Sequence, residues 1–251
     1  MYNWKLTIAY LGKNFYGFQK QPNKRTVQGV LEKILRDIFQ EDIKVFGAGR
    51  TDAGVHALNQ IVSFKSLKNW DLDKLRRAIS SLLPEDIILK NIERVDENFH
   101  ARYSAKSKSY IYIIYNCEIP SLFLKDFVWW IKYPLNKEIL STSARLLLGK
   151  HNFINFCIQE GNKDTVVEIE NCFWKFYGHF LIFYISASHF LWKMVRFLVG
   201  GMVELGCGRK NIDEWISYLE RKFDRRFSPC APPQGLYLFD VKYDNLRDDS
   251  T

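Results

Sequence analysis

Cysteine is scarce in this sequence, and its spacing gives no sign of a structural role. The 251 residues include five cysteines, an odd number, and no two of them form a Cys-x-x-Cys pair. The five histidines show no pairing at the spacing of metal ligands. We therefore expect no disulfide framework, no zinc site and no other metal site.

Long apolar segments are also missing. The uncharged apolar run at residues 180–187 is far shorter than the roughly 20 residues that a membrane-spanning helix needs. The N-terminal residues 1–7 lack the basic and then apolar order of a signal peptide. Hydrophobic residues make up 47% of the chain and charged residues 25%, which is typical of a globular protein. We expect a soluble, cytoplasmic protein without a membrane partner.

Acidic residues are absent from three tracts, residues 1–31, 98–117 and 171–203. Over the whole chain, Lys and Arg outnumber Asp and Glu by 36 to 28, which gives a formal net charge of +8. The tracts mix cations with aromatic residues, and this mixture suits phosphates and unstacked bases. A solvated basic surface over an ordinary aromatic core would have the same composition, so both interpretations stay open. In the second tract these residues are His100, Arg102, Tyr103, Lys106, Lys108 and Tyr110.

The spacing of apolar residues predicts an α+β protein of two halves, each a sheet with helices on one side. In the first half we expect strands at residues 5–11, 43–46, 60–64 and 87–92, a helix capped by Thr26, and a helix at 72–83. In the second half we expect strands at residues 107–115, 166–177, 180–186 and 236–243, and helices at 137–148, 191–205 and from 213. The predicted domains are residues 1–104 and 105–251, with any large cleft between them.

The loop around Asp52 is the most informative segment. Glycines 47, 49 and 54 flank Arg50, Thr51 and Asp52, and glycine lets a backbone approach a ligand closely. Beside Arg50, the Asp52 carboxylate is expected to stay ionised, which suits a nucleophile or a base. The loop is not a dinucleotide motif, because Asp52 stands where the third glycine belongs, and no Gly-Lys-Ser/Thr follows. The alternative is an ordinary turn in which Asp52 caps a helix or pairs with Arg50.

Arg196 lies in an almost entirely apolar stretch, residues 190–203, which we expect to be a largely buried helix. An unpaired buried charge is costly, so Arg196 needs a carboxylate or a phosphate. Asp52 is the natural candidate, because the surrounding tract contains no acid. On helical spacing, Arg196 shares a face with Trp192. The alternatives are that Arg196 reaches solvent or meets another acid.

Tyr110 lies in the middle of the strand expected at residues 107–115, with Tyr112 on the same face. An aromatic ring beside a basic tract can stack on an extruded base. It can equally be a core residue whose hydroxyl is hydrogen-bonded, and spacing does not decide between the two.

These residues carry a resemblance to the TruA family of tRNA pseudouridine synthases. The segment Gly49–Ala57, with the sequence GRTDAGVHA, is similar to that family's active-site signature throughout. The likeness extends along nearly the whole chain, except between Arg209 and Ala231. One departure is Trp192-Lys193, where relatives often carry other polar or histidine residues. Further matching segments are Tyr10–Gln19, Thr26–Gln28, Phe99–Arg102, Tyr110–Tyr112, Met194–Arg196 and Ala231–Leu238.

The resemblance implies two α+β halves of the pseudouridine synthase fold on either side of a basic cleft. It implies a cofactor-free homodimer that converts uridine to pseudouridine at positions 38 to 40 of the tRNA anticodon stem-loop. By motif position, Asp52 is the catalytic aspartate and Arg196 its basic partner. Tyr110 is the ring that packs on the target base, and Arg50 helps to splay the RNA. The base must leave its stack before an aspartate can reach it.

Two other classes of function share some of these features. A non-catalytic RNA-binding module would keep the cleft and lose Asp52, which is present here. A carboxylate glycosidase needs two opposed acids, and no second acid lies near the loop in the sequence. The step that Asp52 performs also stays open: addition to the base, attack on C1′ or removal of the 2′ proton.

Overall fold

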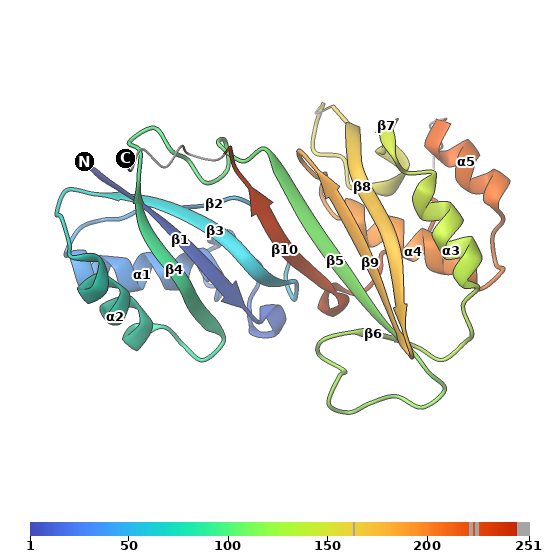
Figure 1. The fold of residues 1–251 in the computed structure, drawn as a ribbon, viewed down its shortest axis with the longest axis horizontal. Coiled ribbons are helices and arrows are strands. Elements are labelled where there is room, and N and C mark those ends of the chain that lie inside the picture. The colour runs from blue at the N-terminus through green and yellow to red at the C-terminus, as the bar shows by residue number, and fades with distance from the viewer. Residues whose placement is uncertain (163, 221–222, 224–225, 245–251) are drawn as a thin grey trace, which may run out of the picture. The chain divides into compact units, whose positions relative to one another are not determined.

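Residues 1–162, 164–220, 223 and 226–244 are described by a computed structural model (Figure 1). The described residues divide into two units, those of 1–108 together with 238–244, and those within 109–237. The last strand belongs to the first unit from residue 238 onward. The functional division at residues 104 and 105 stays a prediction.

The first unit is a sheet with two helices. Its strands pair in the order β4-β1-β3, with β2 also on β3, and residues 238–242 of β10 follow β3. The helices α1 and α2 lie side by side (Figure 1). The elements are β1 (Tyr2–Tyr10), η1 (Gly12–Asn14), α1 (Val27–Phe39), β2 (Val45–Gly47), β3 (His56–Ser66), α2 (Leu72–Leu82), β4 (Ile87–Val95) and β10 (Leu236–Lys242).

Along β1, fully buried side chains alternate with less buried ones, and the buried side chains pack against the helices. Trp4 and Leu6 are fully buried, and the Trp4 ring lies 6.4 Å from Phe39 at the end of α1. The predicted cap of α1 is confirmed, because the Thr26 side chain accepts a hydrogen bond of 3.3 Å from Gly29 N–H. Such a cap satisfies one of the free donors in the first turn of a helix.

The second unit is also a sheet with helices. Its strands pair in the order β5-β9-β8-β7, and β6 pairs with β5 in parallel. The unit includes β5 from residue 109 and β10 up to residue 237. Its elements are β5 (Ser107–Asn116), β6 (Trp129–Ile131), α3 (Lys137–Arg145), β7 (Gly149–Asn152), η2 (Ile154–Phe156), β8 (Val166–Tyr177), β9 (Phe180–Ala187), α4 (Met194–Gly206), α5 (Ile212–Glu220) and η3 (Pro233–Gly235).

Indole groups connect the helices of the second unit to one another and to the sheet. Trp215 Nε1 in α5 donates to the Ser143 carbonyl in α3 at 3.2 Å. Trp174 Nε1 in β8 lies 3.3 Å from the Met202 sulfur in α4. Each indole N–H thus has a partner inside the core, as burial requires. No helix in the described part of the chain has both the length and the apolar character to cross a membrane.

Three details of the sequence prediction are corrected here. The helix α4 begins at Met194 and not at Leu191, because Lys193 adopts a left-handed conformation with φ of 61°. Trp192 therefore precedes the helix and shares no helical face with Arg196.

The helix α3 ends at Arg145, because the last turn tightens and Leu148 N–H donates a hydrogen bond to the Arg145 carbonyl. The short strands β6 and β7 have no counterpart in the prediction. The hairpin of β8 and β9 about Gly178 and His179 is confirmed.

Candidate active site

The Asp52 loop joins β2 to β3 in the first unit. Thr51 is buried, Asp52 is half-buried and Arg50 is exposed. The backbone turns sharply after Asp52, whose carbonyl accepts from Val55 N–H at 3.2 Å. The loop runs directly into a strand, so the interpretation of Asp52 as a helix cap is wrong. The turn presents Asp52 on a short segment between two paired strands.

Gln60 in β3 fixes the start of this loop. Its Nε2 donates to the Gly49 carbonyl at 2.8 Å, and its Oε1 accepts from Gly49 N–H at 3.2 Å. Gln60 is completely buried. One side chain thereby satisfies both polar groups of a loop residue that lies in no strand, as a buried backbone requires.

Tyr10 holds the middle of the loop. Its hydroxyl shares a hydrogen bond of 2.7 Å with the Thr51 hydroxyl, one residue before Asp52. Burial raises the pKa of Tyr10 to about 12, although its hydrogen bonds to Thr51 and Gln60 act in the opposite direction. The phenol is therefore neutral at physiological pH.

The segment after β1 wraps around the Asp52 loop and leaves no space for side chains there. Phe18 N–H donates to the Thr51 carbonyl at 3.1 Å. A Cβ atom on Gly12 would lie 2.0 Å from the Val55 carbonyl oxygen, and one on Gly17 would lie 2.7 Å from the Thr51 carbonyl oxygen. Gly17 also has a φ of 86°, a backbone conformation that is strained for residues with a side chain. These two glycines let one loop lie directly on the other.

A Gly17→Ala substitution is expected to displace the Asp52 loop. We expect it to lower the free energy of unfolding by at least about 2 kcal/mol and to reduce catalysis, because left-handed strain adds to a clash with backbone. Chemical denaturation and turnover measure the two effects. Gly178→Ala is the matched control, since Gly178 also has a positive φ (56°), but a Cβ there would meet no described atom within 4 Å. It should cost about 1 kcal/mol and leave turnover intact; equal effects of the two variants would contradict the account.

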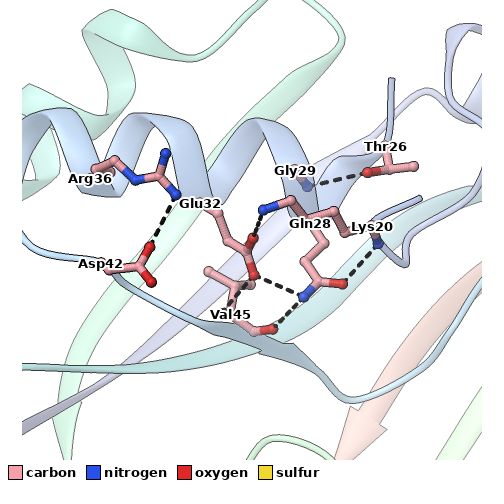
Figure 2. A network of polar contacts seen from close by, with 8 residues as sticks. All are labelled: Lys20, Thr26, Gln28, Gly29, Glu32, Arg36, Asp42 and Val45. Carbon is pink, nitrogen blue, oxygen red and sulfur yellow. Dashed lines mark hydrogen bonds and ion pairs between the residues drawn. The ribbon is translucent and has the colours of Figure 1, made fainter. Parts of the chain in front are cut away.

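Side chains of α1 hold together the two segments that lead into the site (Figure 2). The buried Glu32 carboxylate accepts from Lys20 Nζ at 2.8 Å, from Gln28 Nε2 at 2.9 Å and from Val45 N–H at 3.3 Å. Gln28 in turn accepts from Lys20 N–H at 2.9 Å. Because Lys20 follows the wrapping segment and Val45 begins β2, this network positions both against the same helix.

Arg196 lies in the first turn of α4 in the second unit. Arg196 is half-buried, and all the remaining residues of that helix apart from Glu204 are buried. Its Nε donates to the Ala231 carbonyl at 2.7 Å, and Ala231 N–H donates to the Arg196 carbonyl at 3.1 Å. The guanidinium is thus oriented by the backbone, and part of the predicted need of Arg196 for an acceptor is met by a neutral carbonyl.

Tyr110 and Tyr112 lie on the buried side of β5, as strand alternation predicts. Tyr110 is 8% exposed, and its ring meets Phe190 edge to face with a centroid distance of 5.0 Å. The Tyr112 hydroxyl donates to the Pro232 carbonyl at 2.7 Å. Burial raises the pKa of Tyr112 well above its usual value, and Arg196 opposes this rise. Tyr112 and Arg196 both bind the segment 231–232.

The predicted site residues therefore fall into two groups. Arg50 and Asp52 lie in the first unit, and Tyr110 and Arg196 lie in the second. Their roles, and the pairing of Asp52 with Arg196, stay predictions. Within the described residues, no cluster of three or more His, Cys, Asp or Glu side chains is placed to hold a metal ion.

The residues that position the loop have no recognisable role in the sequence alone. Gln60 reads as one position in a strand, and Tyr10 and Gly17 stand out only as parts of the segment that resembles a known family. The clustering of Gly12 and Gly17 around aromatic residues is the available signal. It does not reveal that their partner is the Asp52 loop.

Comparison with known proteins agrees with the resemblance. A family model described as tRNA pseudouridine synthase matches residues 6–104 and 143–244. The tRNA pseudouridine synthases A of Dictyoglomus thermophilum and Dictyoglomus turgidum are 55% and 56% identical over 245 residues, which cover 97% of this chain and 100% of each relative. The enzyme of the same name from Aquifex aeolicus is 40% identical over 238 residues, covering 95% of this chain and 98% of that protein.

One solved structure is similar to this chain only at low sequence identity. A chain of a Cbf5-Nop10-Gar1 complex covers 79% of this chain at 9% identity, and this chain covers 53% of it, with a TM-score of 0.33. The assignment rests on the sequence relatives. Since the family model and these relatives both span most of its length, this chain belongs to the tRNA pseudouridine synthase family and is an isomerase.

Proposed function

We propose that this enzyme converts uridine to pseudouridine at positions 38 to 40 of the tRNA anticodon stem-loop, and that Asp52 is its catalytic residue. The observation that carries the proposal is the held Asp52 loop. Gln60 holds Gly49, and Tyr10 and the segment at Gly17 hold Thr51, so the backbone is fixed directly before one half-buried carboxylate. A catalytic group must be held in this way if it is to meet a reacting atom in a defined geometry.

The reaction needs a carboxylate and no redox chemistry. The N1–C1′ bond breaks, the detached uracil turns, and C5 forms a new bond to C1′ while the proton on C5 is lost and N1 takes up a proton. An enclosed site keeps the free base close to the sugar, as rejoining requires. The target nucleotide must first leave its stack, which costs a few kcal/mol.

The other predicted residues have complementary roles in this proposal. Tyr110 packs on the extruded base, a contact worth roughly 1–3 kcal/mol, which offsets the cost of unstacking. Arg196, already oriented through the Ala231 carbonyl, pairs with the Asp52 carboxylate. Arg50 is exposed beside Asp52 and holds the RNA strands apart. The family resemblance supports these assignments, together with a homodimer that works in the cytoplasm.

Turnover on defined tRNA substrates tests the proposed target. Unmodified tRNA that carries uridine labelled with tritium at C5 should release tritium, because C5 loses its proton. Transcripts with a single uridine at position 38, 39 or 40 should each be modified. A transcript with cytidine at all three positions is the matched control and should release no tritium above background.

Two results would contradict the proposal in different ways. Release from the control transcript would show that the enzyme acts on another position of the tRNA. Absence of release from every transcript, with protein that is folded and binds tRNA, would remove the proposed reaction itself.

A further inference from the structure

We propose that Phe46, His100 and Tyr103 form a platform on which an unpaired nucleotide of the tRNA, other than the target uridine, stacks, with Arg102 and Lys65 binding the adjoining phosphates. These five residues make up the His100 platform. The inference rests on the proposed function, because it takes tRNA as the ligand. It adds a second place where the RNA is held, away from Asp52 itself.

The rings of the His100 platform lie one against the next. The His100 ring is 4.9 Å from Phe46 and 4.5 Å from Tyr103, measured between centroids, with interplanar angles of 46° and 36°. Tyr103 is 79% exposed and Phe46 is 46% exposed. Two of the three rings are therefore accessible at the surface of the protein.

The turn that carries His100 is held rigidly. His100 Nδ1 accepts from Arg102 N–H at 3.1 Å and from Tyr103 N–H at 3.3 Å. Ala101 is fixed from two sides, since its N–H donates to Ser63 Oγ at 3.0 Å and its carbonyl accepts from the Tyr243 hydroxyl at 2.6 Å. The His100 ring and the backbone that carries Tyr103 are thus held in place by hydrogen bonds, and such preorganisation lowers the entropic cost of binding.

Two cations lie near the rings. The Arg102 guanidinium lies 5.9 Å from the centre of the Tyr103 ring. Arg102 and Lys65 are both close enough to add to the lowering of the His100 pKa, of which burial is the larger cause. Arg102 also contributes to the lowered pKa of Lys108, again after burial. Several positive charges thus affect one another here, in a tract whose sequence (residues 98–117) contains no acid. The negative phosphates of an RNA backbone reduce the repulsion between these positive charges when RNA binds.

Rings and cations together favour a nucleotide over other ligands. Every base has a face that stacks on an aromatic ring, and the adjoining phosphates suit Arg and Lys. Phe46 also stands opposite Ser63 in the pairing of β2 with β3, the two strands that carry the Asp52 loop between them. The same pair of strands therefore carries both the Asp52 loop and part of the His100 platform, so we expect one RNA molecule to contact both.

Binding measurements with two variants test the platform. Tyr103→Ala should weaken the binding of an unmodified tRNA transcript about 10-fold, the size expected for loss of one stacked base. It should leave the affinity for a blunt RNA duplex within two-fold of the unmutated protein, because a duplex offers no free base. Tyr103→Phe keeps the ring and should bind both RNAs normally. Circular dichroism and thermal melting should show that both variants are folded, because position 103 is exposed.

Arg102→Gln tests the electrostatic part of the platform separately. It should weaken the binding of tRNA and of duplex alike. It should also reduce the magnitude of the negative slope of log affinity against log salt concentration by about 1. Tyr103→Ala should leave that slope unchanged. An unchanged slope for Arg102→Gln would overturn the phosphate contact. Binding of tRNA by Tyr103→Ala within two-fold of normal would overturn the stacking contact, and so would equal losses with Tyr103→Phe.

These outcomes are separate from those that test the proposed function, because binding is measured without turnover. Normal tritium release with unaffected binding by Tyr103→Ala would remove the platform and leave the proposed reaction in place. Weakened binding by Tyr103→Ala in a protein that forms no pseudouridine would remove the reaction and leave an RNA-binding platform.

Discussion

Asp52→Asn is expected to abolish pseudouridine formation while the protein still folds and binds tRNA. Asparagine has nearly the same size and can keep the loop backbone in place, but it cannot act as a nucleophile or a base. We expect single-turnover tritium release to fall at least about 1,000-fold, which corresponds to about 4 kcal/mol of lost stabilisation of the transition state. Filter binding should give a dissociation constant for tRNA close to that of the unmutated enzyme.

Asp42→Asn is the matched control for this variant. Asp42 belongs to the same unit, its side chain is 78% exposed, and its partner is Arg36 on the surface. Such an exposed pair contributes little to stability, so turnover should be unaffected. Substantial turnover by Asp52→Asn, or an equal loss in both variants, would contradict a catalytic role for Asp52.

Arg196→Leu is expected to have the second largest effect. The change removes the proposed cationic partner of Asp52 and the hydrogen bond of 2.7 Å to the Ala231 carbonyl. We expect turnover to fall at least about 100-fold, because an active-site carboxylate without its charged partner is poorly placed and poorly stabilised. Arg209→Leu is the control, since Arg209 pairs with Glu204 in the same unit and its side chain is 52% exposed.

The double variant separates a loss of pairing from damage to the fold. If Asp52 and Arg196 act as one unit, Asp52→Asn combined with Arg196→Leu should be no slower than Asp52→Asn alone, because such residues are strongly non-additive. Independent, additive losses would count against the pairing. A stable Arg196→Leu enzyme with nearly normal turnover would remove the pairing altogether.

Local patterns in the sequence predict much of the fold. The cap at Thr26 and the hairpin about Gly178 are both confirmed, because in each case the signal lies within a few adjacent residues. The predicted start of α4 is wrong, because Lys193 adopts a left-handed conformation that is uncommon for residues other than glycine. The predicted end of α3 is wrong because its last residues form a tighter turn with the same apolar spacing.

The sequence predicts which residues supply the chemistry of the candidate site, but it does not predict the contacts that hold them in place. The glycines around Asp52 and the isolation of that acid are visible in the sequence. The contacts that hold the loop join residues far apart in the chain: Gln60 to Gly49, Tyr10 to Thr51, and Phe18 to Thr51. No local pattern encodes such contacts, since each depends on which strands pair and in which register.

A structure of this enzyme bound to unmodified tRNA tests the central claim most directly. The account predicts that one uridine of the anticodon stem-loop is extruded from its stack and packed against Tyr110. It predicts that an Asp52 carboxylate oxygen lies within about 3.5 Å of the sugar or base of that uridine, the distance from which bonds form. A complex in which all three uridines stay stacked, or in which Asp52 lies far from the extruded one, would contradict it.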